Sequence, residues 1–146
     1  MKFTLLLIVV GLAFSYNPSA AVNYALAHCR NYNPAYNSYP GADCANFVSQ
    51  CLIAGGLDLS GCYGLDSRGT LPWVDNLRNC LSNKGWHSSS TRPGSFKAGY
   101  PFFANAYQHA MLATAIRGGS VSYAAHTNDR CGDASMSSGV TYYYNI

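Results

Sequence analysis

Charge is scarce in this sequence, and one acidic residue type is absent. Only 10% of the 146 residues are charged, and none of them is glutamate. Nine Lys and Arg stand against six Asp, for a net charge of +3, and no basic run occurs. Nucleic-acid-binding domains usually carry a clustered basic face, so we expect no nucleic-acid partner.

Long apolar segments are also lacking, except at the N-terminus. There Lys2 precedes an almost continuously apolar run from Phe3 to Phe14, and Ala13-Phe14-Ser15 fits the small-x-small rule of signal peptidase. The run is shorter than the roughly 20 residues that a membrane span needs. We therefore predict a signal peptide over residues 1–15, a single exported domain over residues 16–146, and no membrane association after cleavage.

An exported chain with an even number of cysteines usually forms disulfides. One interpretation therefore pairs all six cysteines, with Cys44 in a bridge. If Cys44 is instead a free nucleophile, Cys51 is the expected buried thiol, because it follows two helical turns later on the apolar face of the same helix. The other four cysteines can then pair in three ways. We favour Cys62–Cys80, which closes a local loop, and Cys29–Cys131, which ties the first predicted helix to the tail.

Periodicity predicts helices first and strands afterwards. Helices are expected at Pro18–His28, with Ser19 as a candidate N-cap, at Asp43–Ala54, with Asp43 as the cap, and at Pro72–Asn83. In the second helix the buried stripe should comprise Phe47, Val48, Cys51 and Leu52. Strands are expected at Tyr100–Phe103, His109–Ile116, Ser120–Ala125 and Val140–Tyr144. This order predicts an α+β domain whose N-terminal helices pack on a C-terminal antiparallel sheet.

Cys44 is the candidate nucleophile. It lies in the first turn of the second predicted helix, where the helix dipole should favour the thiolate. A cysteine hydrolase also needs an imidazole and a group that orients it.

Four histidines could supply that imidazole. His28 and His87 lie where surface roles are expected, whereas His109 opens a predicted strand and His126 ends the next one. A hairpin that turns at Gly118-Gly119 would pair His109 with His126 near its open end. The two histidines would then face Cys44, which predicts a Cys-His-His site. The alternative for His126 is a surface residue at a strand end.

Asp43, His109 and His126 are the residue types that a metal site could use. Their spacing does not resemble a zinc motif such as His-Glu-x-x-His, so we expect no metal and no cofactor.

The motifs that flank these residues resemble a known family. The run Asp43-Cys44-x-Asn46-Phe47-Val48-Ser49-Gln50-Cys51, with Ala54-Gly55-Gly56 after it, is similar to the putative amidase domain of spore-forming bacteria. Looser matches are Ala21-Val22-x-Tyr24-Ala25, Asn33-Pro34-x-Tyr36, Pro72-Trp73-Val74-x-Asn76-Leu77, His109-Ala110-Met111-Leu112 and His126-Thr127. The resemblance implies a papain-like core of the NlpC/CHAP type.

The resemblance also implies roles for individual residues. Cys44 would be the nucleophile and His109 the general acid/base, with His126, or alternatively Asn128, as the third polar residue. The backbone N–H of Cys44 would stabilise the oxyanion. Tyr36, Asn37, Tyr39 and Asp43 are alternative candidates for a side chain that completes the oxyanion hole. Asn46 and Gln50 are expected to be structural.

The function implied is that of a secreted cysteine amidase or endopeptidase that hydrolyses amide bonds in bacterial peptidoglycan peptides. We expect a monomer that acts outside the cell or in a phagosomal or lysosomal lumen. The alternative is a catalytically inactive, disulfide-stabilised binding module on the same fold, in which Cys44 would be bridged.

Overall fold

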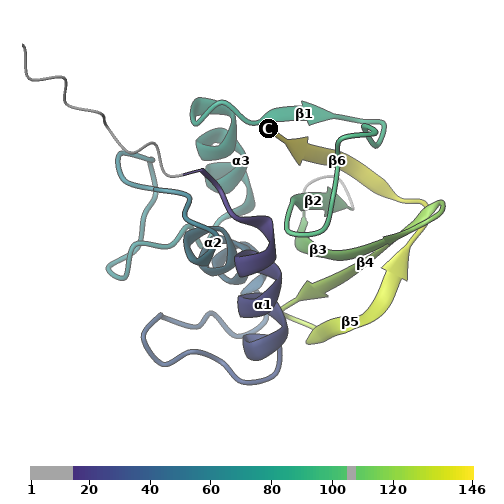
Figure 1. Cartoon of the computed structure of the whole chain (residues 1–146). Helices are drawn as coiled ribbons and strands as arrows, with labels where there is room; N and C mark the ends of the chain where they lie inside the picture. Colours follow the sequence, from purple (N-terminus) through teal and green to yellow (C-terminus); the bar gives the residue numbers. More distant parts are fainter. Residues whose placement is uncertain (1–14, 105–107) are drawn as a thin grey trace, which may run out of the picture.

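The structure is a computed structural model that describes residues 15–104 and 108–146. In this part of the chain, three helices lie on one side of a six-stranded sheet (Figure 1). The helices are α1 (Pro18–His28), α2 (Cys44–Ala54) and α3 (Val74–Asn83). The strands are β1 (His87–Ser89), β2 (Pro101–Ala104), β3 (His109–Arg117), β4 (Ser120–Ala125), β5 (Arg130–Met136) and β6 (Val140–Asn145). The predicted α+β class is confirmed.

All strand pairs in the sheet are antiparallel, and the strand order is β1-β6-β2-β3-β4-β5. The four predicted strands are present as β2, β3, β4 and β6, whereas β1 and β5 were not predicted. Strand β5 contains Gly132 and Asp133 and lacks apolar alternation. It forms because it pairs with β4 and because a disulfide at Cys131 fastens it to the end of α1.

Helix α1 has the predicted bounds but a different cap. The Asn17 side chain accepts a hydrogen bond from the Ala20 N–H at 3.1 Å, so Asn17 and not Ser19 is the N-cap. Just before it, the Tyr16 hydroxyl donates to the Gly99 carbonyl at 2.6 Å, which connects the start of the domain to the segment before β2. The predicted signal peptide over residues 1–15 lies outside the described residues except for Ser15, and it stays a prediction. Within the described residues, no helix combines the length and the apolar character that a membrane crossing requires.

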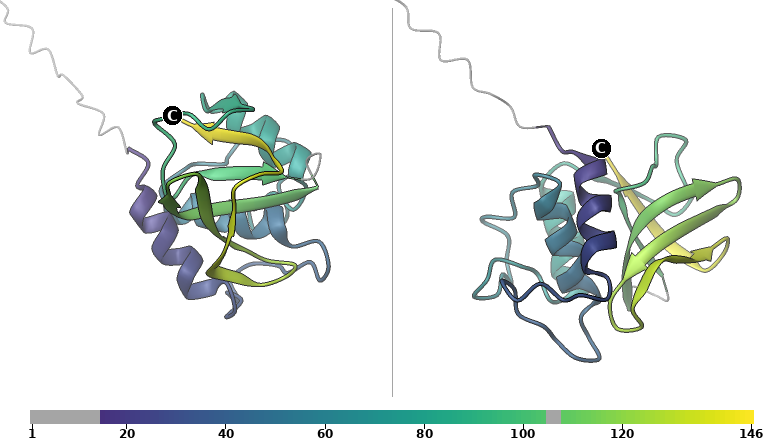
Figure 2. Two further views of the ribbon diagram at one scale, coloured as in Figure 1. Left: turned by 90° about the vertical axis from the view of Figure 1, so that its right-hand side faces the viewer. Right: turned by 60° about the horizontal axis from the view of Figure 1, so that its bottom comes forward.

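Helix α2 is the centre of the core. It packs beside α1 and against the sheet (Figure 2), and residues 44–52 are all buried. The predicted apolar stripe is confirmed, because Phe47, Val48, Cys51 and Leu52 are fully inaccessible.

The polar residues of α2 are buried as well, and each has partners. Asn46 Nδ2 donates to the Asn37 backbone carbonyl at 2.8 Å, and Asn46 Oδ1 accepts from the Thr70 hydroxyl at 2.5 Å. Gln50 accepts from the Tyr24 hydroxyl at 2.8 Å. The expected structural roles of Asn46 and Gln50 are thus supported, because burial without such partners would be costly.

The six cysteines form two disulfides and leave two free thiols. The bridges are Cys29–Cys131 and Cys62–Cys80, which are the favoured pairings. Cys44 and Cys51 are free and buried. The alternative in which Cys44 is bridged is therefore wrong.

Candidate active site

Cys44 is the first residue of α2 and lines a cavity of about 420 Å³ together with His109, the first residue of β3. The Cys44 Sγ lies 3.9 Å from the carbonyl oxygen of Gln108, just before that histidine. The start of the central helix and the start of a central strand thus bring a thiol and an imidazole to one cavity. The other lining residues are Gly41, Ala42, Pro72, Trp73, Val74, Asp75, Gln108 and Thr127.

The pKa of the Cys44 thiol is raised in this structure, although a position at a helix start by itself would lower it. Burial raises the pKa of the Cys44 thiol, and the nearby Asp43 carboxylate acts in the same direction. Backbone N–H groups of Ala110, Ala45 and Cys44 itself favour the thiolate but are outweighed. The helix start thus acts in the predicted direction, but desolvation of the sulfur outweighs it and leaves the pKa of the thiol raised.

His109 is shifted toward its neutral form by the same cause. Burial lowers the pKa of His109, because the imidazolium would lose solvation. A neutral imidazole beside a neutral thiol can accept the proton of the thiol as the sulfur attacks a carbonyl. His109 also lines a second cavity, of about 250 Å³, together with Asn128.

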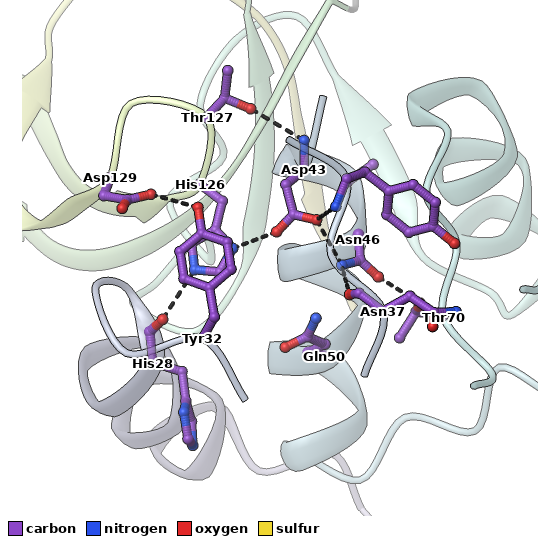
Figure 3. A network of polar contacts seen from close by, with 12 residues as sticks. His28, Tyr32, Asn37, Asp43, Asn46, Gln50, Thr70, His126, Thr127 and Asp129 are labelled. Carbon is purple, nitrogen blue, oxygen red and sulfur yellow. Dashed lines mark hydrogen bonds and ion pairs between the residues drawn. The ribbon is translucent and has the colours of Figure 1, made fainter. Parts of the chain in front are cut away.

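His126 is held elsewhere (Figure 3). Its ring is 1% exposed and lies between the rings of Tyr32 and Phe47, at centroid distances of 3.8 and 3.9 Å. Nδ1 lies 2.5 Å from Asp43 Oδ2, and Nε2 lies 2.9 Å from the carbonyl oxygen of His28. Among the described lining residues of both cavities, His126 is absent. The structure brings Cys44 and His109 together, and it does not bring His126 to them.

The hairpin register explains why the two histidines are not paired. Leu112 pairs with Ala124, and a register shift lies between Ala113 and Ala115. Continued to the open end of the hairpin, this register places Ala110 opposite His126. The predicted pairing of His109 with His126 is wrong by one residue, and adjacent positions on a strand point to opposite faces.

Asp43 occupies the N-cap position of α2, as predicted, but its side chain makes no capping hydrogen bond. Its carboxylate is buried and accepts from the Tyr39 N–H at 2.7 Å and from Asn46 Nδ2 at 2.8 Å, in addition to His126. The residue before Cys44 is therefore fixed by three partners from the preceding loop, the helix and the end of β4.

Thr127 adds a fourth contact to Asp43. Its hydroxyl accepts from the Asp43 N–H at 3.2 Å, and it also lines the cavity of Cys44. Its φ of +86° is unusual for a β-branched residue and costs backbone energy. The turn that follows His126 thus contacts the backbone N–H directly before Cys44 and also lines the cavity.

Tyr36, Asn37 and Tyr39 are the loop residues that could support the oxyanion. None of them is among the described residues that line either cavity. The side chains of Asn37 and Tyr39 donate to Asp66 Oδ2, at 2.9 and 2.8 Å. Although burial opposes it, these bonds and backbone N–H groups lower the pKa of Asp66 to about 2. Tyr36 is half-buried outside the cavities.

The sequence patterns did not select the other polar residues of the two cavities, although Gln108 and Thr127 each adjoin a candidate histidine; these residues are Asp75, Gln108, Thr127, Tyr123 and Arg130. The segment around Trp73 was predicted as part of a helix and as a family match, but not as part of the site, although Pro72, Trp73 and Val74 line the cavity. In the described part of the chain, no group of three metal-ligating side chains is placed to hold an ion.

The fold and site define an α+β domain with a free cysteine at a helix start and a histidine at the start of the adjoining strand. Residues 15–144 match the family described as "Putative amidase domain", and the chain belongs to this family.

Similar proteins were found in sequence and in structure. The chain is 36% identical over 89 residues to the uncharacterized protein YhbB of Bacillus subtilis (strain 168), a match that covers 61% of this chain and 27% of YhbB. The chain thus matches about a quarter of that relative's length. The fold is similar to the crystal structure of Ly7917, with 19% identity, a TM-score of 0.48, and coverage of 84% of this chain and 61% of that one. A structure of Ly7917 with the hydrolyzing product of MDP gives a TM-score of 0.46 at the same identity and coverage.

Proposed function

We propose that this protein is a secreted cysteine amidase or endopeptidase with a papain-like core, acting on amide bonds of bacterial peptidoglycan peptides. The observation that carries the proposal is the free thiol of Cys44 in one cavity with His109. Membership of the amidase family supports amide hydrolysis. The choice of peptidoglycan rests on the sequence resemblance to cell-wall amidases.

In the proposed mechanism, Cys44 Sγ attacks the amide carbon and His109 accepts the thiol proton. The N–H of Cys44, at the N-terminus of α2, donates to the oxyanion. His109 then gives its proton to the leaving amine, and the C–N bond breaks to leave a thioester. Water attacks the thioester with His109 as base, which releases a carboxylic acid and restores the thiol.

A third polar group is needed to orient the imidazole of His109. We assign the orientation of His109 to Asn128, since the two residues line the same cavity. For His126 we propose a positioning role: it holds Asp43, the residue directly before the nucleophile.

Localisation outside the cytoplasm is supported by the two disulfides, because such bonds persist in oxidising compartments. We propose that the enzyme acts as a monomer, outside the cell or in a phagosomal or lysosomal lumen. The competing proposal of an inactive binding module loses its support, since it required a bridged Cys44.

The test is digestion of purified peptidoglycan, with the products identified by mass spectrometry. Cys44→Ala and His109→Asn should each abolish release of new amino and carboxyl groups while the protein stays folded. Cys51→Ala and His87→Asn are matched controls, because the first thiol is outside both cavities and the second imidazole is exposed. Full activity of the Cys44→Ala variant would overturn the proposal.

A further inference from the structure

His109 lies between two cavities that differ in charge. Among the described lining residues, the cavity shared with Cys44 has Asp75 as its charged side chain at neutral pH, and the second cavity has Arg130. Within the described part of the chain, neither the Asp75 carboxylate nor the Arg130 guanidinium takes part in a hydrogen bond or ion pair. The two charges are therefore available to a ligand.

The proposed chemistry assigns one part of the substrate to each cavity. Cys44 lines the first cavity and is not among the described residues of the second, so the acyl carbon bonded to its sulfur must lie in the first. The leaving amine takes its proton from His109 and so departs past the imidazole. The part of the substrate attached to that amine extends toward the second cavity.

The second cavity suits a carboxylate. A guanidinium offers paired N–H donors that match the two oxygens of a carboxylate, and it stays charged at every physiological pH. Tyr123 and Asn128 add a phenol and an amide to the same wall, while Met111 and Met136 provide apolar surface for a short aliphatic side chain.

We propose that the second cavity is a carboxylate-binding subsite for the leaving-amine product, in which Arg130 pairs with the carboxylate of a released amino acid or short peptide. This inference rests on the proposed function, because it takes its direction from Cys44 as nucleophile and His109 as proton donor. A carboxylate on the acyl side would instead meet Asp75 and gain nothing from Arg130.

The cleavage test uses stem peptides isolated from peptidoglycan, either untreated or with their carboxylates amidated. The wild type should cleave the untreated peptides with about tenfold higher kcat/KM, the scale of one charge-assisted contact. Arg130→Gln should remove this preference, and Arg130→Lys should retain part of it. Arg117→Gln, at the exposed far end of β3, is the matched control and should retain all of it. An unchanged preference in Arg130→Gln would overturn the subsite.

A binding test separates the two proposals. The folded Cys44→Ala variant is titrated with the dipeptide Ala-Ala and with its carboxamide, and binding is followed by NMR. The dipeptide should shift resonances around Arg130 and Tyr123, and the carboxamide or the added Arg130→Gln change should weaken binding about tenfold. Carboxylate-dependent binding without any Cys44-dependent hydrolysis would overturn the proposed function alone. Equal affinity for dipeptide and carboxamide would overturn the subsite alone.

Discussion

The carboxylate of Asp43 and the imidazole of His126 lie 2.5 Å apart, with side chains only 2% and 1% exposed. The backbone carbonyl oxygen of His28 can only accept a hydrogen bond, so the His126 Nε2 that faces it carries a hydrogen. The other ring nitrogen, Nδ1, is the atom that contacts the Asp43 carboxylate. Asp43 directly precedes Cys44. The contact therefore joins the end of β4 to the start of the helix that carries Cys44, the proposed nucleophile.

Replacement of His126 by Asn should destabilise the fold strongly. It leaves the buried Asp43 carboxylate without its imidazole and opens a gap between the rings of Tyr32 and Phe47. Loss of one partner of a buried pair typically costs about 3–5 kcal/mol. Urea unfolding of His126→Asn, Asp43→Asn and the double variant measures this coupling, and additive losses would show that the two side chains do not interact.

The same variant should separate positioning from catalysis. We expect His126→Asn to lower kcat by displacing Cys44, with the pH dependence of the remaining activity unchanged, because His109 is still the titrating base. His109→Asn should instead abolish activity. If the acid limb of the pH profile moves in His126→Asn, then His126 titrates in the reaction and the positioning role is wrong.

The pH dependence of kcat/KM should reflect His109. It must be neutral to accept the thiol proton, and burial lowers its pKa, so protonation inactivates only below the usual range. The acid limb should therefore have its midpoint below about 6.5, the pKa of free histidine. A midpoint clearly above that value would contradict a buried, neutral His109.

Alkylation of the unreduced protein with iodoacetamide should modify Cys44 and spare Cys51. Cys44 lines a cavity and is 6% exposed, whereas Cys51 is fully inaccessible and burial raises its pKa strongly. Because burial raises the pKa of Cys44 as well, the reaction should be slow at neutral pH and accelerate as the pH rises. Mass spectrometry of tryptic peptides identifies the site, and rapid labelling at pH 6 would instead indicate a stable thiolate.

Local signals were sufficient for much of this fold. The bounds of α1 were predicted correctly because the Ala-rich segment has helical spacing. The end of α2 at Ala54 was also predicted correctly, because the double glycine at 55–56 ends its apolar stripe, while its start was placed one residue early. The candidate site residues Cys44 and His109 are the first residues of α2 and β3, and the polar and turn residues that precede such starts are visible in the sequence.

The remainder depends on tertiary contacts that no local pattern contains. Strand β5 has no apolar alternation and is held by β4 and a disulfide. The register shift near Thr114 moves the hairpin by one residue, which decides that His126 faces Asp43 instead of the thiol. The raised pKa of Cys44 likewise follows from burial beneath elements distant in sequence.

The two disulfides should differ in their contribution to stability. Their cysteines are separated by 102 residues for Cys29–Cys131 and by 18 for Cys62–Cys80. In the chain-entropy description, a bridge closing a loop of these sizes stabilises by about 4.7 and about 3 kcal/mol, because the longer loop restricts the unfolded chain more. The long bridge also fastens β5 beside the His28 carbonyl that binds His126.

Double alanine variants at each pair test this difference by urea unfolding under non-reducing conditions. The two variants are matched, since each removes one buried and one partly buried sulfur. We expect the Cys29→Ala/Cys131→Ala protein to lose more unfolding free energy, by about 1–2 kcal/mol, and also more kcat. An equal or larger loss in the Cys62→Ala/Cys80→Ala protein would mean that loop length does not govern the stability of this domain.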